Sequence, residues 1–180
     1  MTPTLRILGA IAIASLPMIG TACSAGDDQG YASSDEELST NEKAAFHFFV
    51  DKGLKKYQAA AIVGNLVQES SVIPTAVEFG GGPGRGIAQW SVGGRWDHDS
   101  GDNVAWFAHK HNKSRWSLEL QLEFVWYELD TVGGYGLKAL RNSSNITEAT
   151  IAFERDFEGC GTCDQSKRIE YAKQVLKAFG

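Results

Sequence analysis

The strongest constraint on the fold is a glycine-rich segment at residues 78–96, which separates two regions with helical periodicity. Seven glycines surround the short run Ile87-Ala88-Gln89-Trp90, namely Gly80, Gly81, Gly82, Gly84, Gly86, Gly93 and Gly94. Glycine weakens a helix, and glycines clustered around a short apolar run are typical of a turn-rich hairpin. We therefore expect one small β hairpin inside an otherwise helical chain.

Apolar residues at helical spacing lie on both sides of this segment. Capping residues, glycine stops and apolar stripes predict helices over about 40–52, 55–70, 103–111, from 118 onwards, 149–157 and 169–179. Ser39, Asp102 or Asn103, and Ser117 are the expected N-caps. Helices with one β element predict a mainly helical α+β domain.

The N-terminal residues 1–25 have the pattern of an export signal. Arg6 precedes an apolar run from Ile7 to Ile19, which is too short to cross a bilayer comfortably. The run ends in Gly20-Thr21-Ala22-Cys23, which resembles a bacterial lipoprotein box except that Gly20 stands where an aliphatic residue is usual. Cleavage before Cys23, with lipidation and membrane anchoring of Cys23, and cleavage after Ala25 therefore both stay open.

The composition of the remaining residues separates a linker from a folded domain and argues against a nucleic-acid partner. Residues 26–40 are polar and predict a flexible linker, whereas residues 41–180 predict the folded domain. The net charge is −5, and the sequence lacks the basic stripe of a nucleic-acid-binding protein, so we expect no nucleic-acid partner. We also expect a monomer without a cofactor. His109 and His111 point to different sides of a helix, so we expect no metal site there.

The cysteine count is compatible with export to an oxidising compartment. If Cys23 is lipidated or removed, Cys160 and Cys163 remain as an even pair, and we expect a small disulfide between them. A thioredoxin-like site would need βαβ surroundings, but helical stripes flank this pair. A thiol hydrolase of the wall peptide, using one of these cysteines with His98 or His109 as base, is the alternative enzyme class.

Glu69 is the candidate acid. Ile62, Leu66 and Glu69 stand at positions i, i+4 and i+7 of a predicted helix, so they share one face. Burial on an apolar face disfavours the charged form of a carboxyl group, and the negative end of the helix acts in the same direction. General acid catalysis needs such a neutral carboxyl group. An exposed glutamate at a frayed helix end is the other interpretation.

The order of two motifs identifies a family resemblance. Gly64-Asn65-Leu66-Val67-Gln68-Glu69-Ser70-Ser71 is followed, after the glycine-rich stretch, by Gly86-Ile87-Ala88-Gln89-Trp90 and then Gly93-Gly94-Arg95. This order resembles the phage-tail lysozyme family, within the lysozyme and lytic transglycosylase superfamily, over roughly residues 41–178. The resemblance implies a lysozyme-like fold, with Glu69 as the acid.

The same resemblance implies that Gly86, Gln89 and Trp90 line a glycan groove, with Arg95 helping to position the glycan. In an extended segment, Gln89 would lie on one face and Trp90 on the other. The Trp90 ring would then either stack on a sugar or belong to the core.

A second carboxyl group is expected because glycosidases usually carry two. Glu78 is the first candidate and Asp97 the second, while Asp97 is also a candidate for binding substrate; Asp99 and Asp102 follow. Lytic transglycosylases work with a single glutamate, so hydrolysis and transglycosylation both stay open.

Together these features predict an exported, extracellular or envelope enzyme that cleaves the bond between N-acetylmuramic acid and N-acetylglucosamine in peptidoglycan. Its expected partners are peptidoglycan glycan strands. A wall-binding module that keeps the fold without turnover is the non-enzymatic alternative.

Overall fold

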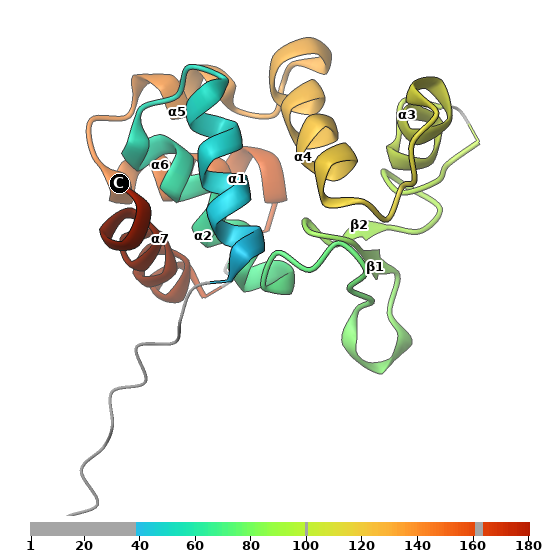
Figure 1. The fold of residues 1–180 in the computed structure, drawn as a ribbon, viewed down its shortest axis with the longest axis horizontal. Helices are drawn as coiled ribbons and strands as arrows, with labels where there is room; N and C mark the ends of the chain where they lie inside the picture. Colours follow the sequence, from blue (N-terminus) through green and yellow to red (C-terminus); the bar gives the residue numbers. More distant parts are fainter. Residues whose placement is uncertain (1–38, 100, 161–163) are drawn as a thin grey trace, which may run out of the picture. The chain divides into compact units, whose positions relative to one another are not determined.

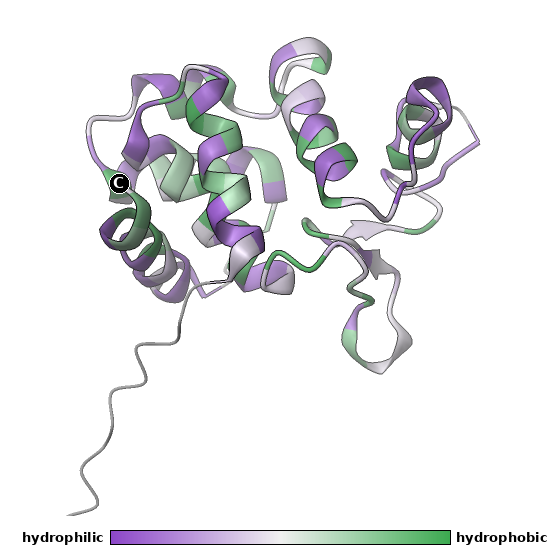
Figure 2. Ribbon diagram, viewed as in Figure 1, coloured by the Kyte–Doolittle hydropathy of each residue, from purple (hydrophilic) through white to green (hydrophobic). Residues whose placement is uncertain are grey.

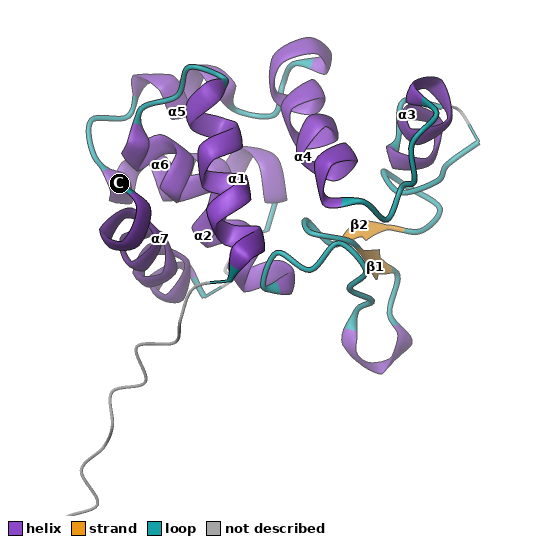
Figure 3. Ribbon diagram, in the orientation of Figure 1, coloured by secondary structure: helices purple, strands orange, loops and turns teal. Residues whose placement is uncertain are grey.

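The mainly helical α+β architecture predicted from the sequence is confirmed in a computed structural model of the chain (Figure 3), which describes residues 39–99, 101–160 and 164–180. In chain order the elements are α1 (Thr40–Asp51), α2 (Lys56–Ser70), the 3-10 turn η1 (Phe79–Gly81), β1 (Gly84–Arg85), β2 (Trp90–Ser91), α3 (Val104–His111), α4 (Leu118–Tyr127), the π-helical η2 (Glu128–Val132), α5 (Leu137–Asn142), α6 (Ile146–Phe153), the π-helical η3 (Glu154–Glu158) and α7 (Gln165–Phe179).

The expected leader at residues 1–25, with Cys23, lies outside the described residues, as does most of the expected linker. None of the described helices combines the length and the apolar character that crossing a membrane requires.

Local capping signals place the beginnings of several helices. Ser39, Asn103 and Ser117, which the sequence predicted as N-caps, each accept a hydrogen bond from the backbone N–H three residues further on. Such a bond satisfies one of the free amides at a helix start, so short sequence signals suffice there. The six-residue helix α5 was not predicted, because it buries Leu140 alone and has no apolar stripe.

Helix α2 is the centre of the domain and packs against α1, α6 and α7 (Figure 1). Its residues from Ala59 to Leu66 are buried, so this helix is apolar on most of its circumference. Gly64 allows the closest approach, since a Cβ atom there would lie 2.4 Å from the backbone nitrogen of Ala172 on α7. The surrounding helices alternate hydrophobic and hydrophilic residues, as expected for one face on the core (Figure 2).

The β hairpin is present, but it differs from the prediction in detail. Its two strands pair Gly84 with Ser91 and Arg85 with Trp90, so residues 86–89 form the turn rather than an extended strand. The expectation of alternating faces through this run is therefore wrong. The turn needs left-handed backbone at both ends, with φ of +71° at Gly86 and +48° at Gln89.

The buried side chain of Gln121 on α4 holds this turn in place. Its Oε1 accepts a hydrogen bond from the Ile87 backbone N–H at 2.9 Å. Its Nε2 donates to the carbonyl oxygens of Pro74 at 2.8 Å and Arg115 at 2.7 Å. A single amide from a distant helix thus fixes the turn and the segment that leads into the hairpin.

Candidate functional site

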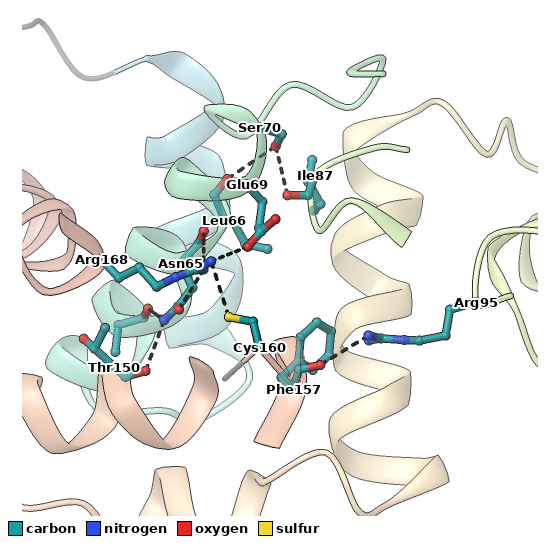
Figure 4. A network of polar contacts seen from close by, with 11 residues as sticks. Asn65, Leu66, Glu69, Ser70, Ile87, Arg95, Thr150, Phe157, Cys160 and Arg168 are labelled. Carbon is teal, nitrogen blue, oxygen red and sulfur yellow. Dashed lines mark hydrogen bonds and ion pairs between the residues drawn. The ribbon is translucent and has the colours of Figure 1, made fainter. Parts of the chain in front are cut away.

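Glu69 lies in the last turn of α2, where the chain turns sharply towards the hairpin. Ser71 and Val72, the first two residues after α2, have φ of +52° and +55°. This left-handed conformation is unusual for a β-branched residue such as Val72, and strained backbone of this kind clusters at functional sites. The Ser70 hydroxyl donates to the Ile87 carbonyl oxygen at 2.9 Å, which ties the end of α2 to the hairpin (Figure 4).

The surroundings of Glu69 are more polar than the sequence predicted. Arg168 of α7 donates from Nη2 to Glu69 Oε1 at 2.5 Å. The Arg168 side chain is 3% exposed and that of Glu69 is 20% exposed, so the pair is largely withdrawn from water. Ile62 and Leu66, which share its helix face, are fully buried, but the Glu69 carboxyl group itself faces a guanidinium.

Asn65, one turn before Glu69 on α2, orients Arg168. Asn65 Oδ1 accepts from Arg168 Nη1 at 3.1 Å, and Asn65 Nδ2 donates to the carbonyl oxygens of Ala61 and Thr150 (Figure 4). Arg168 was not predicted from the sequence. A signal was available, since Arg168, Ala172 and Val175 stand at i, i+4 and i+7 and all three are buried.

Two cavities meet at Glu69 and Gln89, which line both of them. The first, of about 360 Å³, is lined by Glu69, Ala88, Gln89, Trp90, Ser91, Arg95, Glu158 and Cys160. The second, of about 470 Å³, is lined by Glu69, Ser70, Ala76, Val77, Glu78, Phe79 and Gln89. Glu69 thus lies where the two hollows adjoin, as expected of a group that acts on a bond in the middle of a bound chain.

The Trp90 ring lies in the core, which decides between the two roles considered for it. The residue is 1% exposed, and its indole N–H donates to Glu128 Oε2 at 3.1 Å. It packs against Trp96 and Phe124. A sugar-stacking role for this ring is therefore wrong, although the residue borders the first cavity.

Arg95 also borders the first cavity while being held by the protein. Its guanidinium donates to both carboxylate oxygens of Glu128 at 2.7 Å and lies over the rings of Tyr135 and Phe157. Nη1 also donates to the Phe157 carbonyl oxygen at 3.2 Å (Figure 4). Because it is paired with Glu128, this guanidinium forms a rigid and charge-compensated part of the cavity wall.

Gln89 and Gly86 shape the hairpin turn. Gln89 Nε2 donates to the Gly86 carbonyl oxygen at 2.9 Å, which leaves the side chain half-buried between the two cavities. A Cβ atom at Gly86 would lie 2.6 Å from Gln121 Oε1. Gly86 therefore serves the turn geometry, which sets the position of Gln89.

Glu78, Asp97 and Asp102, three candidates for the second carboxyl group, have different surroundings in the structure. Glu78 borders the second cavity together with Glu69, and its Oε2 accepts from the Gly84 backbone N–H at 2.9 Å. Asp97 accepts from the Gly93 N–H at 2.8 Å and closes a turn. Asp102 accepts from the Tyr127 hydroxyl at 2.6 Å, and this hydrogen bond raises the pKa of Tyr127 to about 12.

Glu158 is an acidic group that was not predicted from the sequence. It ends η3 and lines the first cavity together with Glu69. Burial, reinforced by the negative charge of Glu69, raises the pKa of Glu158 to about 8. The sequence signal was weak: the residue follows Phe157 at the end of an apolar stripe, where a solvated charge is common.

The cysteine pair and the histidines give the thiol alternative little support. Cys160 borders the first cavity, whereas Cys163 lies outside the described residues, so the predicted disulfide stays a prediction. His98 and His109 are exposed, and neither lines the cavity that Cys160 borders. Within 39–99, 101–160 and 164–180, no cluster of three or more His, Cys, Asp or Glu side chains is placed to hold a metal ion.

Comparison with known protein families matches residues 40–179 to the family described as phage tail lysozyme. No curated protein matches the chain. The matched segment extends from the first residue of α1 to the last of α7, so it includes Glu69, the hairpin, Glu158 and Arg168.

Proposed function

The chain belongs to the phage tail lysozyme family, and we propose that it cleaves the glycan of peptidoglycan between N-acetylmuramic acid and N-acetylglucosamine, with Glu69 as the general acid. The observation that carries this proposal is the position of Glu69 between two adjoining cavities. A glycan strand lying along both would place a glycosidic bond beside this carboxyl group.

The walls of the two cavities suit different parts of a sugar chain. Beside the second cavity, Val77 and Phe79 are exposed at 54% and 101%, and their apolar surfaces suit the hydrocarbon face of a sugar ring. The first cavity is bordered by the charged side chains of Arg95 and Glu158. We propose that the glycan binds across both walls and that Gln89 contacts it between them.

Arg168 and Asn65 would hold Glu69 in position for proton transfer. A carboxyl group fixed by a buried guanidinium has few rotamers to lose when substrate binds, so its alignment with the glycosidic oxygen costs little entropy. Proton donation to that oxygen breaks the bond, and a water molecule or the substrate's own 6-hydroxyl then completes the reaction. The first outcome is hydrolysis and the second is transglycosylation.

The proposed site of action is the cell envelope. The family acts on cell walls, and an exported chain would meet its substrate there. Export through residues 1–25 and anchoring through a lipidated Cys23 remain part of the proposal.

Clearing of a suspension of purified cell walls tests the proposed acid. We expect the wild type and Glu170→Gln, a control at an exposed position on α7, to lower the turbidity at equal rates. Glu69→Gln should lower it at least about a hundredfold more slowly, since general acid catalysis contributes that much or more. Equal clearing by Glu69→Gln would show that another group supplies the proton.

A further inference from the structure

Glu158 stands out because a carboxyl oxygen is buried without a hydrogen-bond partner. Among the described residues nothing donates to its Oε1, which has almost no contact with solvent. A buried carboxylate without donors is costly, whereas a neutral carboxylic acid is much less so. The side chain nevertheless borders the cavity that Glu69 lines.

Four charged groups from other parts of the chain act on Glu158. Glu69 approaches from α2 and Glu128 from η2, and both negative charges disfavour a second one on Glu158. Arg95, which follows β2, and Arg168 of α7 act in the opposite direction. Each arginine is already paired with one of the two glutamates, Arg95 with Glu128 and Arg168 with Glu69, so Glu158 is left as the uncompensated acid.

Unlike Glu158, Glu69 has a cation directly beside its carboxyl group. Its Oε1 faces the buried Arg168, an arrangement that suits a carboxylate. A general acid, however, must carry a proton when the glycosidic oxygen arrives. The cavity thus contains one carboxyl group placed to act and a second one placed to keep a proton.

We propose that Glu69 and Glu158 share one proton at neutral pH, that Glu158 holds it in the free enzyme, and that it passes to Glu69 for delivery to the glycosidic oxygen. Glu158 supplies the proton to Glu69 and does not itself contact the substrate, so it is a positioning residue rather than a catalytic one. This inference rests on the proposed function, because it takes Glu69 as the group that meets the substrate.

Each proton in this scheme moves between the two carboxyl groups, the substrate and the attacking water, and none is left over. Glu158 gives its proton, through water in the cavity, to Glu69, and Glu69 gives it to the glycosidic oxygen as the carbon–oxygen bond breaks with its electron pair on oxygen. The attacking water adds hydroxide to the anomeric carbon, and its second proton returns to the carboxyl pair. A cavity of about 360 Å³ has room for such a relay, since a water molecule occupies about 30 Å³.

The test compares Glu158→Gln with the wild type over a pH series from about 5 to about 9, with Glu170→Gln as control. Glutamine has the shape and neutrality of the protonated acid but holds no transferable proton. We expect kcat near pH 7 to fall at least about tenfold with KM within about twofold, and the alkaline decline of kcat to move to lower pH. Glu158→Asp, which keeps a carboxyl group, should recover part of the lost kcat.

A Glu158→Gln enzyme with wild-type kcat and an unchanged pH profile would overturn the inference. If Glu158→Gln does not fold, infrared spectroscopy of the wild type decides, because a protonated carboxyl band should be present near pH 7 and lost by about pH 9. Absence of that band at pH 7 would also overturn it. Full activity of Glu69→Gln would instead refute the proposed function, so the two failures are distinguishable.

Discussion

Replacing Arg168 by methionine removes the cation that faces Glu69 while keeping a long side chain in the same space. The variant loses the 2.5 Å bond to Glu69 and the 3.1 Å bond to Asn65. Removing one partner of a fully buried ion pair costs about 3–5 kcal/mol, because the other charge stays buried alone. Since the Glu69 side chain is 20% exposed and can be partly hydrated, we expect a loss of about 2–4 kcal/mol in the free energy of unfolding.

Urea unfolding near neutral pH measures this loss. Lys173→Met, at an exposed position on the same helix, is the matched control and should change the free energy by less than about 0.5 kcal/mol. In a double-mutant cycle with Glu69→Gln, the coupling energy should be about 1–3 kcal/mol, because the uncharged glutamine no longer needs the guanidinium. A loss below about 1 kcal/mol, or strictly additive single effects, would refute this reasoning.

Three further results are expected. Gly86→Ala should lower the free energy of unfolding by about 2 kcal/mol in a chemical denaturation experiment, because the residue has φ of +71° and the new Cβ atom meets Gln121. An unchanged denaturation midpoint would mean that the turn relaxes freely. Stability should fall as pH rises from 4.5, the ordinary pKa of a glutamate, to about 8, because over this range the folded state holds a proton on Glu158 that the unfolded state has released. The slope should be at most about 1.4 kcal/mol per pH unit and should be absent in Glu158→Gln; equal slopes would exclude Glu158 as its source. Phe79→Ala should raise KM about threefold to tenfold, because it removes a contact with the glycan. The melting temperature should not change, because the ring is exposed. An unchanged KM would show that Phe79 is not part of the glycan-binding surface.

The features that the sequence predicted well depend on neighbouring residues. The N-caps at Ser39, Asn103 and Ser117 need three or four residues to form, and the glycine-rich segment marks the hairpin directly. The position of Glu69 at the end of α2 follows from the same local logic, because an apolar stripe and a following turn are both visible in the sequence.

The features that it missed depend on contacts between distant segments. Arg168 meets Glu69 across 99 positions of the chain, and no local pattern specifies that partner. Whether the Trp90 ring stacks on a sugar or lies in the core could not be predicted for the same reason, since its hydrogen bond goes to Glu128, 38 positions away. Glu158 differs from a surface glutamate through its burial near charged residues of α2, η2 and α7.

The extended strand expected through Gln89 was wrong for a related reason. A short run between glycines suited a strand of a hairpin, but Gln121 on α4 binds the Ile87 backbone and holds residues 86–89 as a turn. A tertiary contact thus overrides the local β pattern.

Mass spectrometry of the fragments released from purified peptidoglycan tests the central claim most directly. For the wild type we predict disaccharide peptides cut at N-acetylmuramic acid, with reducing ends if water attacks and anhydro ends if the 6-hydroxyl attacks. Glu69→Gln should release neither above background. Fragments cut in the peptide alone, or glycan fragments released equally by Glu69→Gln, would contradict the assignment of Glu69 as the acid of a glycan-cleaving enzyme.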